Sequence, residues 1–207
     1  MSKNLPFVYI VDDEESVFKA VTRIIKSAGY AVETFNSANS FLSLQDIKHP
    51  SCLVLDIRMP GISGLALQET LQNKGIFIPI IFITGHGDIP MTVKAMKAGA
   101  IDFLPKPFDQ KTLLDLIRVA LTKDKLDQKR LNEKAKIQEL ISVLSPRELQ
   151  VMKLVIKGML NKQIAQELKL SIKTVKIHRG HLTQKLQVKS VAELVRLGQL
   201  ANLKSSV

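Results

Sequence analysis

The chain has 207 residues, a formal net charge of +11, a hydrophobic fraction of 45% and one cysteine, which excludes an internal disulfide. This length accommodates one large domain or two small ones, and the composition is that of a globular protein. No apolar run approaches the roughly 20 residues of a membrane span and no signal-peptide pattern is present, so we expect a cytoplasmic protein with no membrane partner.

The positive charge is concentrated in the C-terminal part of the chain. Residues 1–123 carry 13 Lys or Arg against 12 Asp or Glu, whereas residues 124–207 carry 17 against 7. This asymmetry indicates an N-terminal part with its own chemistry and a C-terminal part that meets a polyanion. A basic surface that serves only solubility is the alternative, and charge alone does not exclude it.

Residues 7–121 alternate short apolar runs with helical patterns. The predicted strands are Phe7–Val11, Ala31–Phe35, Cys52–Leu55, Pro79–Ile83 and Asp102–Leu104. The predicted helices are 14–28, 38–45, 64–74, 90–98 and 109–121, with Ser63 and Asp109 as N-caps and Gly29 and Gly99 just beyond helix ends. These units predict an α/β doubly wound five-stranded parallel sheet, because parallel strands need helical crossovers.

The C-terminal part shows no strand pattern after residue 143. Residues 122–142 lack Gly and Pro and predict a polar helical linker. Ser145–Glu148 has the pattern of a capping box, Ser190–Glu193 repeats it, and Asn161 and Ser171 are natural N-caps between them. We therefore expect an all-α domain of four helices. The predicted division of the chain is 1–122, 123–142 and 143–207.

Polar residues follow the ends of four predicted strands. They are Asp12 and Asp13 after the first strand, Asp56 after the third, Thr84 after the fourth and Lys106 after the fifth. Ligands of doubly wound sheets bind at the carboxyl ends of the strands. Clustered carboxylates raise each other's pKa unless a cation shares them, and such oxygen ligands suit Mg²⁺. A metal-clamped carboxylate beside an ammonium and a hydroxyl fits a phosphoryl acceptor, although each residue alone would be an ordinary surface residue.

Residues 5–121 resemble a CheY-type receiver domain. The resemblance rests on Val11–Glu15, Leu55–Gly61, Ile83–Gly85 and Leu104–Phe108. It implies that Asp56 accepts the phosphoryl group. It also implies that Mg²⁺ is held, directly or through water, by Asp12, Asp13, Asp56 and the backbone carbonyl of Arg58.

The same resemblance assigns roles to three residues near strand ends. Thr84 and Lys106 would bind the phosphoryl oxygens, and the Lys106–Pro107 bond would be cis. Phe103 falls at the position of the aromatic switch residue, with plain core packing as the alternative.

Residues 144–200 resemble the LuxR/FixJ-type helix-turn-helix, with a scaffold helix at 161–168 and a recognition helix at 172–186. The carrying stretches are Leu144–Leu149, Gly158–Ala165, Ser171–Arg179 and Lys185–Leu186. From the residues alone, an apolar stripe faces the core at Ile172, Val175, Leu182 and Leu186. Between Lys169 and Lys189 there are six Lys or Arg and no acidic residue, which suits contact with DNA phosphates.

The recognition helix contains the DNA contacts that the resemblance implies. Those expected to face base edges are Lys176, Ile177 and Gly180. Those expected to meet phosphates and position the helix are Lys173, Thr174, Arg179 and Lys185.

The order of the two domains resembles the FixJ/NarL group of response regulators, and Gly87–Met91 with Phe103–Phe108 places the chain nearer FixJ. This resemblance implies a phosphorylation-dependent transcriptional regulator that is not an enzyme. The partners it implies are a sensor histidine kinase, double-stranded promoter DNA and a second copy of the phosphorylated chain. RNA polymerase is a further candidate partner.

Two alternatives belong to other functional classes. A haloacid-dehalogenase-like phosphatase also uses an Asp, a Thr, a Lys and Mg²⁺, but its nucleophile follows the first strand in an Asp-x-Asp pattern. Here Asp12 and Asp13 are adjacent, and the isolated Asp56 follows the third strand. The other alternative is an adaptor whose basic domain binds protein or RNA, because helix-turn-helix modules serve several functions.

Overall fold

The computed structural model describes residues 5–85, 89–201 and 203. The chain divides into two compact units, the first ending at Gln128 and the second beginning at Lys129. Among the described helices, none combines the length and the apolar character that crossing a membrane requires.

The first unit is built on a parallel sheet of five strands in the order β2-β1-β3-β4-β5. The strands are β1 (Phe7–Val11), β2 (Ala31–Phe35), β3 (Ser51–Asp56), β4 (Ile80–Thr84) and β5 (Asp102–Pro105). The doubly wound sheet expected from the sequence is thus confirmed, and the predicted strand ends differ from the observed ones by at most one residue.

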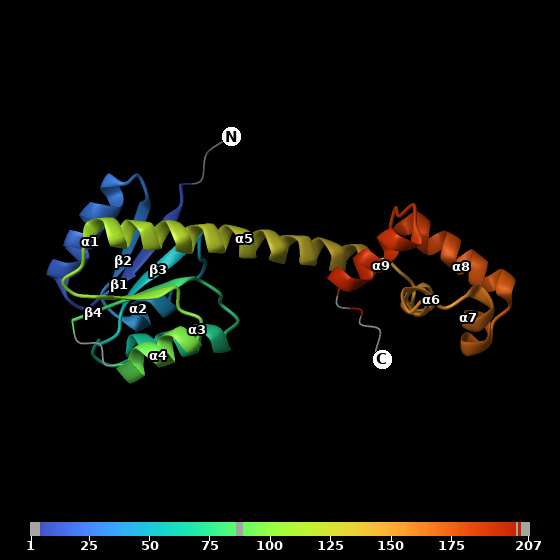
Figure 1. Cartoon of the computed structure of the whole chain (residues 1–207), viewed down its shortest axis with the longest axis horizontal. Helices are drawn as coiled ribbons and strands as arrows, with labels where there is room; N and C mark the ends of the chain where they lie inside the picture. Colours follow the sequence, from blue (N-terminus) through green and yellow to red (C-terminus); the bar gives the residue numbers. More distant parts are fainter. Residues whose placement is uncertain (1–4, 86–88, 202, 204–207) are drawn as a thin grey trace. The chain divides into compact units, whose positions relative to one another are not determined.

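Helices cover both faces of this sheet (Figure 1). The helices are α1 (Glu15–Ser27), α2 (Ala38–Leu42), α3 (Gly64–Asn73), α4 (Ile89–Lys97) and α5 (Gln110–Ser142). One core contains residues of α1 and α5, and the other contains residues of α2, α3 and α4. Helix α2 ends at Leu42 and not at residue 45 as predicted. Ser43 is its C-cap, and the Ser43 hydroxyl donates to the carbonyl of Ser40.

Alternation along the strands fills the two cores, because successive side chains of a strand point to opposite faces. In β1, Val8 and Ile10 pack on the α1 and α5 side, whereas Tyr9 and Val11 pack on the other side. All six residues of β3 are buried, including the single cysteine, Cys52, which is fully inaccessible. The strand that ends in Asp56 therefore lies at the centre of the unit and is held on both faces.

Two glycine positions and two caps confirm the predicted helix boundaries. Gly29 and Gly99 follow α1 and α4 with φ values of 84° and 86°, which favour glycine. The Ser63 hydroxyl accepts from the N–H of Ala66 at the start of α3, and the Asp109 carboxylate accepts from the N–H of Thr112 in α5.

The second unit is entirely helical where it is described. Its helices are the end of α5, α6 (Pro146–Ile156), α7 (Asn161–Leu168), α8 (Ile172–Lys185) and α9 (Val191–Leu200). Ile137 and Ile141 of α5 join the core formed by the other helices. Ser145 and Glu148 form the reciprocal capping box that the sequence predicts at the start of α6.

Three predictions about the second unit are wrong in detail. Leu160 is the N-cap of α7 and Asn161 is its first residue, because the Asn161 carboxamide instead accepts a hydrogen bond from α8. Ser190 caps α9, but the Glu193 carboxylate accepts from the N–H of Lys189 rather than from Ser190, so the box is not reciprocal. Ile172 is 46% exposed at the first position of α8, where the apolar stripe has not yet reached the core.

Candidate functional site

The polar residues at the strand ends meet at one edge of the sheet. Asp12 directly follows β1, Asp56 and Thr84 are the last residues of β3 and β4, and Lys106 directly follows β5. The N–H of Lys106 donates to the carbonyl of Thr84 at 2.7 Å, which fixes the β5 end against β4. The Lys106–Pro107 bond is cis, as the resemblance implied.

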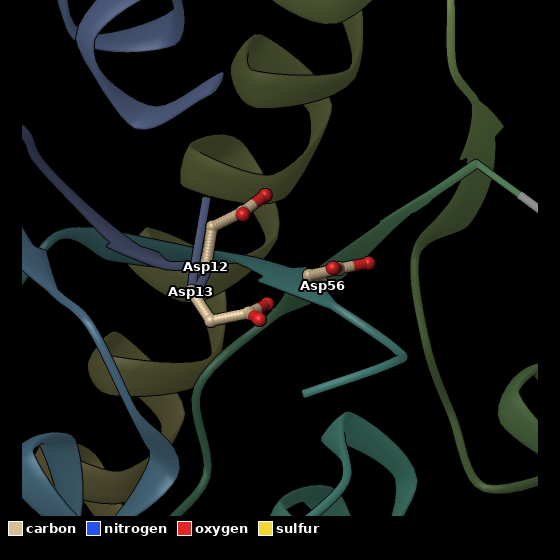
Figure 2. Close-up of side chains that lie close together, drawn as sticks. All are labelled: Asp12, Asp13 and Asp56. Carbon is tan, nitrogen blue, oxygen red and sulfur yellow. The ribbon is translucent and has the colours of Figure 1, made fainter. Parts of the chain in front are cut away.

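Three carboxylates form the centre of this site. One oxygen from each of Asp12, Asp13 and Asp56 lies within 4.8 Å of the others. Figure 2 shows the three side chains close together at the ends of their strands. Asp12 and Asp56 are buried, at 0% and 4% exposure, whereas Asp13 is exposed. Two buried negative groups and one accessible group thus face a common point at the sheet edge.

The ammonium of Lys106 lies against the carboxylates. Its Nζ is 2.9 Å from Asp12 Oδ2, 3.5 Å from Glu14 Oε1 and 3.7 Å from Asp56 Oδ2. Burial lowers the pKa of Lys106, but the hydrogen bond to Asp12 and the surrounding negative charges outweigh this effect and raise the pKa. Lys106 therefore remains a cation at this site.

Asp56 retains an unfavourable environment despite that cation. Burial raises the pKa of its carboxyl group, the Lys106 charge lowers it, and the Asp12 charge raises it again, with a raised pKa as the result. Its Oδ1 atom is buried and has no hydrogen-bond partner among the described residues. A buried oxygen without a partner is costly and is the kind of atom that a ligand satisfies.

The donor set fits a magnesium ion. Mg²⁺ prefers carboxylate and water oxygens and is commonly held by one or two carboxylates together with phosphate oxygens. The orphaned Asp56 oxygen, the buried Asp12 and the exposed Asp13 offer this chemistry with one side open to solvent. Arg58 follows on the loop with an exposed side chain, and its carbonyl as a fourth ligand stays a prediction.

The two remaining receiver residues lie on neighbouring strands. Thr84 is 1% exposed at the end of β4. Phe103 is half-buried in β5 and packs against the core on the α4 side, a position that fits both the switch role and plain packing. The FixJ-like stretch Gly87–Met91 lies partly outside the described residues, which resume at Ile89.

Helix α8 corresponds to the expected recognition helix and ends one residue earlier than predicted. Ser171 is its N-cap and accepts from the N–H of Thr174, while Val175 and Leu182 are fully buried against the other helices. The predicted DNA-contacting side chains of its first half are exposed or half-exposed. They are Lys173, Thr174, Lys176 and Ile177, followed by the exposed Gly180.

Two other predicted DNA contacts already have partners within the protein. Arg179 Nη1 donates to Asn161 Oδ1 of α7 at 2.6 Å. Lys185 Nζ donates to Glu148 Oε2 of α6 at 2.7 Å, and Glu148 is only 3% exposed. The sequence predicted Glu148 as part of a capping box but gave no signal that its carboxylate also meets Lys185.

A second buried carboxylate in the first unit was not predicted. Asp124 of α5 is 1% exposed, and its Oδ2 accepts from the N–H of Ser51 and lies 2.7 Å from His49 Nδ1. Ser51 begins β3, so this carboxylate ties α5 to the amino end of the strand that carries Asp56 at its other end. Its place in a polar helical stretch gave no sign of this contact.

Comparison with known proteins covers both units. The family model of the response regulator receiver domain matches residues 8–118, and that of the bacterial regulatory proteins of the luxR family matches residues 142–197. Nodulation protein W of Bradyrhizobium diazoefficiens is 46% identical over 199 residues, covering 96% of this chain and 88% of that protein.

Further relatives match nearly the whole length of the chain. The transcriptional regulatory protein FixJ of Rhizobium meliloti is 40% identical over 190 residues, covering 92% of this chain and 93% of that protein. The solved structure of the response regulator StyR has a TM-score of 0.81 and 49% identity, covering 94% of this chain and 98% of that one. The chain therefore belongs to the FixJ-type transcriptional response regulators, in which a receiver domain is joined to a LuxR-type helix-turn-helix domain.

Proposed function

We propose that phosphorylation of Asp56 by a sensor histidine kinase switches this regulator. In the transfer, the P–N bond of the kinase phosphohistidine breaks and a P–O bond forms to an Asp56 carboxylate oxygen, while the histidine nitrogen keeps the electron pair. The observation that supports Asp56 most directly is its buried Oδ1, which has no hydrogen-bond partner among the described residues. The Lys106 ammonium stands 3.7 Å from the other oxygen of the same carboxylate.

The surrounding residues have separate roles in this proposal. Asp12, Asp13, Asp56 and the carbonyl of Arg58 would hold Mg²⁺, which when bound neutralises charge on the phosphoryl oxygens. Lys106 and the Thr84 hydroxyl would bind those oxygens from the ends of neighbouring strands. Because phosphorylation is then a signal and not a turnover, we propose that the chain is not an enzyme.

Acetyl phosphate labelling tests this assignment. The wild-type chain is expected to take up one phosphoryl group in the presence of Mg²⁺, with borohydride trapping locating it at Asp56. Asp56→Asn and the wild type in EDTA should both remain unlabelled. Labelling of the variant, or labelling unaffected by EDTA, would contradict the proposal, and sustained hydrolysis of small phosphomonoesters would favour the phosphatase alternative.

We propose that α8 enters the major groove of promoter DNA. Lys176, Ile177 and Gly180 would face base edges, and Lys173, Thr174 and Arg179 would meet phosphates. The exposed basic side chains of α8 and the absence of acidic residues between Lys169 and Lys189 support this assignment. The sequence prediction also included Lys185, whose ammonium already lies on Glu148.

Binding selection on a library of duplexes tests this division of roles. Lys176→Ala should reduce discrimination between sequences, whereas Arg179→Ala should weaken all sequences by a similar factor. Equal effects of the two replacements would contradict the division. Preference for RNA or for a protein partner over duplex DNA would favour the adaptor alternative.

We propose that the phosphorylated chain dimerises through the receiver. Helix α4 carries Ile89, Val93 and Met96, which are 80%, 43% and 41% exposed, and this apolar surface supports a partner on that face. A phosphoryl group would draw Thr84 inward and give Phe103 room to rotate, which reshapes the surface of α4 and β5. Two linked DNA contacts then raise avidity by about 10²–10⁴-fold.

Sedimentation with beryllofluoride, a mimic of the phosphoryl group, tests dimerisation. The wild type should shift to a dimer, and Thr84→Ala should blunt the shift. If the protein stays monomeric while its DNA affinity rises, the dimer mechanism is contradicted. Release of a covered recognition helix would then explain the rise in affinity.

We further propose the chain division 1–122, 123–142 and 143–207, with the middle segment as a helical linker. Residues 123–142 belong to the same helix, α5, as residues 110–122, which supports a helical linker. Since promoter DNA is the proposed target, we propose that the protein acts in the cytoplasm, and RNA polymerase is a further proposed partner.

A further inference from the structure

The carboxylate of Glu148 is buried in the second unit, at 3% exposure, and contacts three other residues. Its Oε2 accepts from the N–H of Ser145 at 2.8 Å and from Lys185 Nζ at 2.7 Å, and its Oε1 lies 3.9 Å from His181 Nδ1. The hydrogen bond from Lys185, followed by that from Ser145, lowers the pKa of Glu148 to about 2. The carboxylate is therefore charged, and it requires a cation because a buried unpaired charge is strongly unfavourable.

Among the described residues, Lys185 is the only basic residue of α8 whose side-chain nitrogen lies within 3 Å of a carboxylate oxygen. Its Nζ also donates to the carbonyl of Val143, at 3.4 Å. Lys173 and Lys176 are exposed, and the described part of the chain records no ion pair for either of them. The ammonium of Lys185 is thus held by a carboxylate and a carbonyl of the protein although its side chain is 41% exposed, whereas no ion pair holds the other two lysines among the described residues.

The position of Lys185 around the helix agrees with this engagement. Lys173, Lys176, Ile177 and Gly180 follow the i, i+3, i+4, i+7 spacing of a single helical face. At 100° per residue, Lys185 lies roughly 130° from the centre of that face. It follows the buried Leu182 by three residues, so it borders the side of α8 that packs on the core.

We infer that Lys185 is a positioning residue rather than a DNA ligand, and that it locks the C-terminal end of α8 onto Glu148 of α6. The pair fixes the rotation and tilt of the recognition helix, so that Lys176 and its neighbours are presented at a constant angle. This inference rests on the proposal that α8 is the recognition helix.

The salt dependence of DNA binding distinguishes the two roles. A lysine that neutralises a DNA phosphate contributes about 0.9 to the slope of log affinity against log salt concentration, whereas a lysine that acts through helix position contributes nothing to it. Binding of the full chain to a fluorescein-labelled duplex of mixed sequence is measured by anisotropy over a series of KCl concentrations. The variants are Lys185→Met, Glu148→Gln, their combination, and Lys173→Met as the matched exposed lysine.

The positioning role predicts a distinct pattern. Lys185→Met should lower affinity by about 10-fold at unchanged slope, because Glu148 is left charged and unpaired. The double variant should recover only the part of that loss that the unpaired buried charge causes, because the pair that fixes α8 is still absent. Lys173→Met should lower both the affinity and the slope, by about 0.9 in the slope.

Other outcomes would contradict either the positioning role of Lys185 or the proposal that α8 binds DNA. A slope reduced by about 0.9 in Lys185→Met, with no recovery in the double variant, would make Lys185 a phosphate contact and overturn the inference. An unchanged slope in Lys173→Met would instead count against α8 as the DNA-binding helix. If circular dichroism shows that Lys185→Met alone does not fold, the double variant decides: wild-type slope supports the inference and a reduced slope overturns it.

Discussion

Asp56 in the first unit and Glu148 in the second are both buried carboxylates, at 4% and 3% exposure, but their surroundings differ. Asp56 keeps one oxygen without a hydrogen-bond partner among the described residues, and a neighbouring carboxylate raises its pKa in addition to burial. Glu148 has a backbone N–H and an ammonium on one oxygen, and its pKa is lowered to about 2.

The difference in hydrogen bonding distinguishes a carboxylate that can bind a ligand from one that stabilises the fold. A buried polar group whose partners all come from the protein stabilises the fold and leaves nothing for a ligand to supply. A buried group that is left incompletely satisfied reduces stability until a ligand completes it.

Lys106→Met should slow phosphorylation by acetyl phosphate about 100-fold, because an ammonium aimed at the transferring oxygens is lost. Mg²⁺ affinity should rise in the same variant, since three carboxylates lose their cation. Phos-tag electrophoresis measures the rate and calorimetric titration the metal affinity. Lys97→Met, which removes an exposed lysine of α4, is the matched control. If Lys106→Met is phosphorylated at the wild-type rate, Lys106 does not take part in the phosphorylation of Asp56.

Glu148→Gln should lower the free energy of unfolding of the second unit by about 2 kcal/mol, the contribution of hydrogen bonds to a charged group. The amide can still accept from Ser145, so the loss isolates the ion pair with Lys185. Hydrogen-exchange mass spectrometry measures it, because peptides of α6 report on this unit alone. Unchanged protection in α6 would mean that the pair contributes nothing.

The pH dependence of the second unit should carry the signature of Glu148. Its pKa falls from 4.5 to about 2 on folding, so its stabilisation is complete above pH 4.5 and is lost as pH falls toward 2. Exchange protection of α6 measured across this window should decline in the wild type. In Glu148→Gln the decline should be shallower, and equal slopes in the two proteins would contradict the lowered pKa.

Asp56→Asn should have the opposite sign and stabilise the first unit by about 1 kcal/mol in magnesium-free buffer. The neutral amide removes a charge that burial disfavours most, with Asp12 adding to this effect and Lys106 opposing it. Exchange protection of β3 peptides in EDTA is the measurement. A loss of protection would show that the ionised Asp56 already stabilises the empty fold, and the contrast with Glu148 would fail.

Asn161→Ala should produce the smallest effect, a loss of DNA affinity of about threefold at unchanged salt slope. The hydrogen bond that holds Arg179 is lost while the Arg179 charge remains. Salt-dependent anisotropy measures both quantities, with Gln166→Ala on the exposed side of α7 as control. A reduced slope would indicate that Asn161 directs Arg179 onto a phosphate.

The sequence predicted the sheet and its acidic edge because both follow from local patterns. Apolar runs set the strands, the helical crossovers make them parallel, and parallel strands must bring Asp12, Asp56 and Lys106 to one edge. The caps at Ser63 and Ser145 were predictable for the same reason, since a capping residue and its target lie three positions apart.

Contacts between distant segments could not be predicted in this way. The Lys185–Glu148 pair spans 37 residues and the Asp124–His49 pair spans 75, and nothing in the neighbourhood of either residue marks its partner. The error at Asn161 has the same origin, because its contact with Arg179 of α8 and not the local pattern decided where its side chain lies.

The burial of Cys52 makes its thiol a reporter of how often the sheet of the receiver opens. Burial raises the pKa of its thiol, and the side chain is fully inaccessible in β3, so a thiol reagent can reach it only when the sheet opens. Because the chain has one cysteine, the rate of labelling counts these openings without interference from any other site. An ion that binds only the closed sheet must slow this labelling, by a factor set by its concentration and affinity.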